Sequence, residues 1–96
     1  MTAYVISRVT MKPGPAFEAY RRLAAASIAR HGGRYLARGG AITVLEGEWR
    51  AGAILVAFPS MEAARAWYSS PDYAEALAHR DDAVERDLIV VEGLDT

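Results

Sequence analysis

The histidine at position 31 stands where an acid–base group would be useful. His31 continues an apolar stripe that begins at Tyr20 and includes Ile28, with steps of three and four residues typical of one helical face. An imidazole on that face could act as an acid or a base near neutral pH. The structural alternative is that His31 only ends its helix, because the glycine pair 32–33 follows it and glycine is typical of a helix end.

Two arginines, Arg34 and Arg38, flank a short strand-like segment. Their even spacing predicts that both side chains lie on one face of the strand. Two neighbouring guanidinium groups would then clamp the carboxylate of a small substrate. The alternative is a structural ion pair with Glu46, with Glu48 or with an acidic residue of a partner chain.

Three aromatic residues surround a helix break at Ser70-Pro71: Trp67, Tyr68 and Tyr73. A gap in a helix lined by aromatic rings would form the wall of a pocket for a small organic molecule. Tyr68, like His31, is a candidate proton carrier in such a pocket. The alternative is core packing, with the tyrosine hydroxyls bonded to the backbone.

The sequence lacks the usual pattern of metal ligands. The sequence has no cysteine, and its two histidines, His31 and His79, lie on different expected elements without the spacing of metal ligands. The two glycine pairs do not sit between a strand and a following helix, as a phosphate-binding loop requires. We therefore expect no metal and no cofactor.

The net charge and the hydropathy pattern argue against nucleic acid and membranes as binding partners. Eleven Lys and Arg against twelve Asp and Glu leave a net charge of −1, which argues against nucleic-acid binding. The longest apolar run, residues 53–58, is much shorter than the roughly 20 residues of a membrane span. The N-terminus shows no signal-peptide pattern. These features predict a cytoplasmic protein that contacts neither nucleic acid nor membrane.

The order of expected elements predicts a single α+β domain over residues 1–96. Whether residues 34–46 form a tight hairpin or one long strand bent at a glycine bulge stays open, and the bent strand is favoured. The pattern is βαββαβ, a ferredoxin-like sandwich with an antiparallel sheet and both helices on one face. The expected elements are a strand at 3–10, a helix from 15 to 31, strands at 34–38, 42–46 and 53–58, helices after Ser60 and Pro71, a polar connection at 81–86 and a strand at 87–92.

The strands are apolar on both faces, which predicts a partner for the sheet. In the last strand, for example, Leu88 and Val90 oppose Ile89 and Val91. Two helices can cover only one face, and an exposed apolar face of that size is unusual in a monomer. We therefore expect a homodimer through the free sheet face, which also explains a hydrophobic content of 52% in a short chain.

Several motifs resemble those of the bacterial domain-of-unknown-function thirteen-thirty family, in the same order along essentially the whole chain. They are GGRYLARGG at 32–40, LEGEW at 45–49, FPS at 58–60, ARAWY at 64–68 and SPDY at 70–73. The resemblance implies a dimeric α+β barrel and no established reaction. Related families include cofactor-free monooxygenases, muconolactone isomerases and haem-binding peroxidases, with a pocket commonly found between sheet and helices.

Two functional hypotheses follow. The first is a cofactor-independent enzyme for a small organic acid or aromatic compound, with His31 or Tyr68 carrying a proton and Arg34 or Arg38 holding an anion. Trp67 and Tyr73 would complete the ligand site. The second is a non-catalytic, ligand-binding or stress-associated homodimer. The observation that discriminates between the two is whether His31 and an arginine converge on a pocket of about 300 Å³ or more. If Trp67 and Phe17 fill that space, the enzyme hypothesis loses its site.

Overall fold

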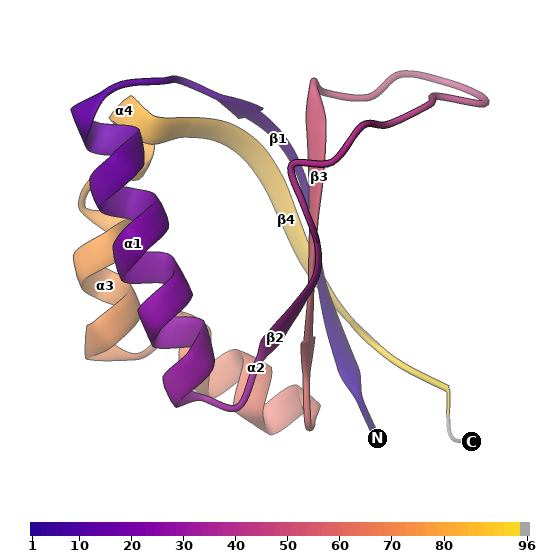
Figure 1. Ribbon diagram of the computed structural model, residues 1–96. Coiled ribbons are helices and arrows are strands. Elements are labelled where there is room, and N and C mark those ends of the chain that lie inside the picture. Colours follow the sequence, from indigo (N-terminus) through magenta and orange to yellow (C-terminus); the bar gives the residue numbers. More distant parts are fainter. Residues whose placement is uncertain (95–96) are drawn as a thin grey trace.

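A four-stranded antiparallel sheet carries all the helices on one face (Figure 1). The computed structural model describes residues 1–94. The strand order is β2-β3-β1-β4, with every neighbouring pair antiparallel, so the predicted ferredoxin-like α+β fold is confirmed. The elements are β1 (Ala3–Met11), α1 (Pro15–Arg30), β2 (Arg34–Arg38), β3 (Gly52–Phe58), α2 (Met61–Tyr68), α3 (Pro71–Leu77), α4 (Arg80–Ala83) and β4 (Val84–Glu92).

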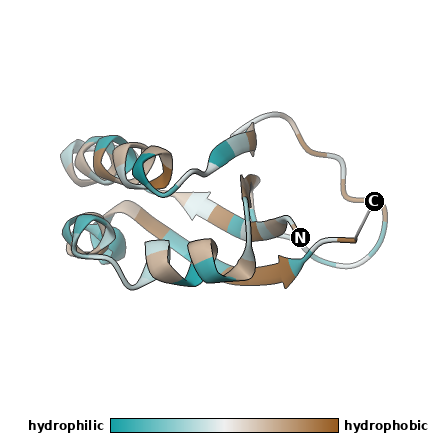
Figure 2. Ribbon diagram, turned by 90° about the horizontal axis from the view of Figure 1, so that it is seen from below, coloured by the Kyte–Doolittle hydropathy of each residue, from teal (hydrophilic) through white to brown (hydrophobic). Residues whose placement is uncertain are grey.

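The strand register divides the side chains between two faces. Val5 on β1 pairs with Val56 on β3 and Val90 on β4, and this row faces the helices. The next residue, Ile6, pairs with Leu55 and Ile89 on the face that no helix covers. We call these the helix face and the open face. Figure 2 shows apolar colour along much of the strands, whereas the helices carry alternating polar and apolar bands.

Local signals place the helix ends as the sequence predicts. Pro15 begins α1, and Gly32, at φ 78°, ends the helix while the Gly33 amide donates to the Ile28 carbonyl at 2.9 Å. Ser60 Oγ accepts a hydrogen bond from the amide of Ala63 at 3.0 Å and so caps α2. These ends fix where α1 and α2 meet the sheet.

The break between α2 and α3 is held by one serine. Ser70 Oγ donates to the Trp67 carbonyl at 2.7 Å and accepts from the Tyr73 amide at 3.1 Å. The hydroxyl therefore closes one helix and caps the next, and Pro71 starts α3 where a missing N–H is harmless. The restart directs Tyr73 into the interior, where it is fully buried.

The predicted strand at 42–46 is wrong. Residues 39–51 form a loop that leaves the sheet on the side away from the helices (Figure 1). Ile42 and Val44 favour strands, but residues 42–46 are exposed and pair with no neighbouring strand. The irregularity lies inside β2 instead, as a register shift between Tyr35 and Ala37. Neither the tight hairpin nor the strand bent at Gly39-Gly40 describes this segment.

The predicted polar connection at 81–86 is also wrong. Its first part belongs to α4, and β4 begins at Val84 rather than at Asp87. Val84 pairs with Met11 at the end of β1, and the Lys12 amide donates to the Ala83 carbonyl at 2.8 Å. The longer pairing with β1 makes Arg86 part of β4. Its side chain therefore lies on the helix face of the sheet.

We expect Gly33→Ala to destabilise the protein by about 1–3 kcal/mol, the usual cost of overfilling a packed core. A Cβ at Gly33 would lie 2.7 Å from the Phe58 ring and 2.8 Å from Ile28, and both neighbours are buried. Gly40→Ala is the matched control, because a Cβ there meets nothing within 4 Å. Urea unfolding of the two variants checks this, and equal stabilities would contradict the packing described.

Candidate functional site

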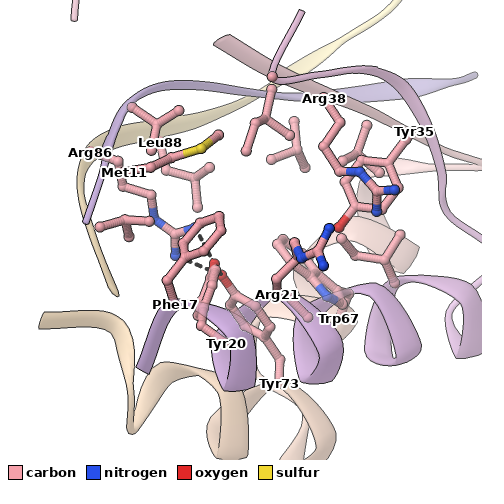
Figure 3. Close-up of a pocket in the computed structure, with 18 residues that line it drawn as sticks. Met11, Phe17, Tyr20, Arg21, Tyr35, Arg38, Trp67, Tyr73, Arg86 and Leu88 are labelled. Atoms are coloured by element: carbon pink, nitrogen blue, oxygen red, sulfur yellow. Dashed lines mark hydrogen bonds between the residues drawn. The ribbon is translucent and has the colours of Figure 1, made fainter. Parts of the chain in front are cut away.

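A cavity of about 210 Å³ lies between the helix layer and the sheet. We call it the helix–sheet pocket, and Figure 3 shows its lining. The volume is below the roughly 300 Å³ of common ligand sites but above the about 150 Å³ that holds a benzene molecule. A compound with a single ring and small substituents therefore matches its size. Most of the wall is apolar, with contributions from Met11, Phe17, Ile28, Ile54, Val56, Trp67 and Leu88.

One end of the pocket holds three polar groups from three separate elements. The hydroxyls of Tyr20 on α1 and Tyr73 on α3 are 2.6 Å apart. Arg86 on β4 donates one N–H to Tyr20 and another to the Tyr73 hydroxyl at 2.6 Å (Figure 3). We call this arrangement the Tyr–Arg cluster. It places a positive charge against two hydroxyls at the end of a largely apolar pocket, while Arg86 also borders a polar groove on the outer surface.

Proton counting shows what the Tyr–Arg cluster offers a ligand. A guanidinium has only donors, so Arg86 donates to both hydroxyl oxygens. One phenol then donates to the other across the 2.6 Å contact. The second phenolic proton has no further acceptor in the hydrogen-bond network of residues 1–94. The cluster therefore presents one O–H donor, backed by a positive charge, to an acceptor in the pocket.

Burial controls the charge states in the Tyr–Arg cluster. It raises the pKa of Tyr20 far above the ordinary 10.0, Tyr73 adds to the rise, and Arg86 opposes it. For Arg86 itself, burial favours a lower pKa, but the adjoining tyrosine oxygens outweigh this and the pKa is raised. At neutral pH Tyr20 is therefore a neutral donor rather than a base, and Arg86 remains a cation.

Packing around Trp67 holds the cluster in place. The Trp67 ring lies 4.2 Å from the Tyr73 ring and 5.3 Å from that of Phe58, measured between centroids. Its Nε1 donates to Ser27 Oγ at 3.0 Å, and that hydroxyl donates in turn to the Ala24 carbonyl at 2.8 Å. The indole therefore links α2 to α1 and supports Tyr73 on α3 from one side.

Two further arginines line the pocket on the side away from the Tyr–Arg cluster (Figure 3). The Arg38 guanidinium lies over the Tyr35 ring, 4.4 Å from its centroid. Arg21 projects from α1 and also pairs with Glu18 at 3.1 Å. Burial raises the pKa of Tyr35, although Arg38 opposes the rise. With Arg86, three guanidinium groups and no carboxylate line this pocket within the described residues.

Three of the six site residues predicted from the sequence line the helix–sheet pocket: Arg38, Trp67 and Tyr73. His31 does not, because it lies at the end of α1 with Nδ1 2.9 Å from the Ser27 carbonyl. Tyr68 is 42% exposed and borders a separate open groove between α2 and β4. His31 and an arginine therefore do not converge on this pocket.

Arg34 and Arg38 lie on opposite faces of the sheet, so their predicted common face is wrong. Arg34 pairs with Ala57 and belongs to the open face, whereas Arg38 pairs with Ile54 on the helix face. The register shift inside β2 reverses the alternation between them. Neither arginine forms an ion pair with Glu46 or Glu48, and within residues 1–94 Arg38 has no ion-pair partner.

Four polar residues of the pocket were not predicted from the sequence: Tyr20 as a polar group, Arg21, Tyr35 and Arg86. One signal was available for Arg86. It shares the strand alternation of Leu88 and Val90, so it lies on the face that those residues bury. A charged residue in phase with apolar positions is unusual and marks a place to examine.

Residues 1–94 contain no group of three or more His, Cys, Asp or Glu side chains arranged to hold a metal ion. No helix in the same part of the chain is long and apolar enough to cross a membrane.

The fold and the pocket together define a ferredoxin-like α+β protein with a ligand-sized cavity between sheet and helices. The chain belongs to the family described as domain of unknown function (DUF1330), whose profile matches residues 2–94. No match was found among the curated proteins.

Solved structures share the fold. RPA0582, a protein of unknown function from Rhodopseudomonas palustris, is 25% identical with a TM-score of 0.76, over 99% of this chain and 84% of that one. SnoaB, a cofactor-independent oxygenase from Streptomyces nogalater, is 15% identical with a TM-score of 0.64, over 99% and 95%. A dimeric protein of unknown function and ferredoxin-like fold from Bacteroides fragilis is 13% identical with a TM-score of 0.60, over 96% of each chain.

The raised pKa of Tyr20 predicts a pH-dependent stability. Above the ordinary value of 10.0 the unfolded chain loses the Tyr20 proton while the folded protein keeps it. The unfolded state then binds fewer protons, so the free energy of unfolding falls as pH rises, by up to about 1.4 kcal/mol per pH unit for this one group. Denaturant unfolding at several alkaline pH values measures the slope. In Tyr20→Phe the slope should be smaller, and an unchanged slope would contradict the burial of this hydroxyl.

Proposed function

We propose that this protein is a cofactor-independent enzyme that binds a single-ring phenol or enolisable carbonyl compound in the helix–sheet pocket. The Tyr–Arg cluster would stabilise the oxygen anion of that ligand. The observation that carries the proposal is that Arg86 donates to both Tyr20 and Tyr73, whose hydroxyls lie 2.6 Å apart, at one end of an apolar cavity of about 210 Å³.

The electrostatics of the pocket favour an oxyanion. Fixed donors aimed at a developing negative charge are most effective where water is excluded and the donors need no rearrangement. The two tyrosines hold Arg86 in position, and one phenolic proton remains to be donated to the ligand. The proton that the ligand loses goes to solvent, because the neutral Tyr20 is no base. With dioxygen as the second substrate, the phenolate or enolate would transfer one electron to O2 and combine at a carbon atom with the superoxide formed. A C–O bond forms, the organic substrate is oxidised by two electrons, and the O2 unit, reduced to a peroxide, takes a proton from solvent.

The comparison with solved structures also supports an enzyme that needs no cofactor. SnoaB has this fold and is a cofactor-independent oxygenase, so the architecture is compatible with such chemistry. Fold alone does not define a reaction, so the proposed activity depends on the Tyr–Arg cluster.

One observation favours the non-catalytic alternative. The described lining of the pocket contains no His, Asp or Glu, so no side chain there has an ordinary pKa near neutrality. A binding protein would need none, and would hold its ligand in the neutral form. The two functions differ in the ionisation state of the bound phenol.

Titration of para-nitrophenol distinguishes them, because only its phenolate is yellow. We expect the pKa of the bound phenol to fall by about one unit or more, which corresponds to roughly 1.4 kcal/mol of preference for the anion. Arg86→Gln and Tyr73→Phe should reduce that fall, and Arg22→Gln, at an exposed position of α1, should preserve it. Binding with an unshifted pKa would support the non-catalytic function, and absence of binding would contradict both.

We further propose that two copies assemble through the open face. This face carries Ile89 and Val91, which are 58% and 43% exposed, beside Ile6 and Leu55. The Arg8–Asp87 ion pair at 2.7 Å forms part of a charged border, and the hydrogen bond from Arg8 lowers the pKa of Asp87. An apolar centre with a charged rim is typical of protein interfaces.

The loop and the comparison support the same assembly. Residues 39–51 project on the open-face side of the sheet (Figure 1) and expose Leu45 and Trp49, where a second copy would cover them. The Bacteroides fragilis protein has the same fold and is dimeric.

Ile89→Lys should therefore shift the protein from dimer to monomer in analytical ultracentrifugation at micromolar concentration. The lysine would place an unpaired charge in the apolar centre of the interface. Ala26→Lys is the matched control, because Ala26 is exposed on α1 on the other side of the sheet. A wild-type protein that sediments as a monomer would contradict the assembly.

A further inference from the structure

We infer that the ligand of the helix–sheet pocket carries a carboxylate on the side of its ring opposite to the phenol or enol oxygen, and that Arg38 and Arg21 bind this carboxylate. The inference rests on the proposed function and adds the substrate class, a single-ring hydroxy acid. It depends on the arrangement of charge at the two ends of the pocket.

The irregularity in β2 brings Arg38 to the pocket. A regular strand would keep Arg34 and Arg38 on one face, but the register shift between Tyr35 and Ala37 places only Arg38 on the helix face. There its guanidinium lies against the Tyr35 ring, 4.4 Å from the centroid, and both side chains line the pocket. This contact aligns the cation without neutralising it.

Arg21 approaches the same region from the helix layer. Arg21 and Arg38 both line the pocket and both border an open hollow on the outer surface, together with Glu18 and Arg22. The two side chains therefore stand at the mouth, where the pocket meets solvent. The Arg21–Glu18 pair is exposed, and such pairs contribute only about 0–1 kcal/mol, so a ligand carboxylate can compete for Arg21.

The charges that line the pocket indicate which further group the ligand carries. Three guanidinium groups line the described pocket, at Arg21, Arg38 and Arg86, and no lining residue is acidic. Arg38 also has no ion-pair partner within residues 1–94. One oxygen anion at the Tyr–Arg cluster leaves Arg38 without a counter-charge, and Arg21 has only its exposed pair with Glu18. A carboxylate accepts two N–H groups of an arginine side by side and is the matching ligand group.

The position of the two ends predicts the substitution pattern. Tyr73 and Tyr20 at the inner end are 0% and 8% exposed, whereas Arg21 and Arg38 are exposed at the mouth. Figure 3 shows the Tyr–Arg cluster and the Arg21–Arg38 pair on different sides of the cavity. With about 210 Å³ there is room for one ring between them. The two oxygen groups should therefore stand para to one another.

Calorimetric binding of three probes tests the inference: para-hydroxybenzoate, meta-hydroxybenzoate and the uncharged para-cresol. We expect the wild-type protein to bind para-hydroxybenzoate at least tenfold more tightly than either of the other two. Arg38→Gln should remove most of the preference over para-cresol. Arg34→Gln is the matched control, because Arg34 belongs to the same strand but lies on the open face.

The outcomes separate this inference from the proposed function. Equal affinity for para-hydroxybenzoate and para-cresol would overturn the carboxylate site, while binding of para-cresol that depends on Arg86 would still support the Tyr–Arg cluster. Equal affinity for the para and meta acids would overturn the opposed arrangement. If Arg34→Gln also lost the preference for para-hydroxybenzoate, the preference would come from the overall positive charge of the protein. That result would overturn the role of Arg38. Failure of all three probes to bind would overturn the inference and the proposed function together.

Discussion

Arg86 carries a permanent positive charge on the helix face of the sheet, and the architecture of the pocket depends on how that charge is accommodated. A buried cation without partners costs several kcal/mol. Here Arg86 donates to the hydroxyl of Tyr20 on α1 and to that of Tyr73 on α3, the latter at 2.6 Å. These two hydrogen bonds connect β4 to two helices. Burial raises the pKa of Tyr20 and keeps it neutral. The result is a fixed donor cluster beside a cavity that apolar side chains do not fill.

The alternation of the strands gives the two sheet faces different roles. Val5 and Leu88 belong to the layer that encloses the pocket, while their neighbours Ile6 and Ile89 lie on the open face. A shift of one residue in register would exchange these roles along a whole strand. Such a shift does occur within β2, and it is what separates Arg38 from Arg34. The same sheet thus supplies a ligand site on one side and the proposed interface on the other.

Much of the fold could be predicted because local residue types determine it. Proline, glycine and capping serine mark the helix ends. The alternation of side chains along each strand shows that the open face is also apolar. The site could be predicted only in part, since it depends on register between distant segments. Arg86 lies in an acidic, polar stretch, and only the pairing of Val84 with Met11 shows that the stretch is strand. The shift in β2 involves no glycine, so nothing in the sequence marks it. His31 follows the helical stripe, but it lies where α1 ends.

A ring bound between the two groups of cations should take a single orientation. A crystal structure of the protein with para-hydroxybenzoate would reveal that orientation. We expect the ring inside the helix–sheet pocket, with its hydroxyl oxygen in hydrogen-bond contact with the Tyr–Arg cluster and its carboxylate between Arg21 and Arg38. A ligand bound in the open groove beside Tyr68, or a ring with its carboxylate turned toward Arg86, would contradict it.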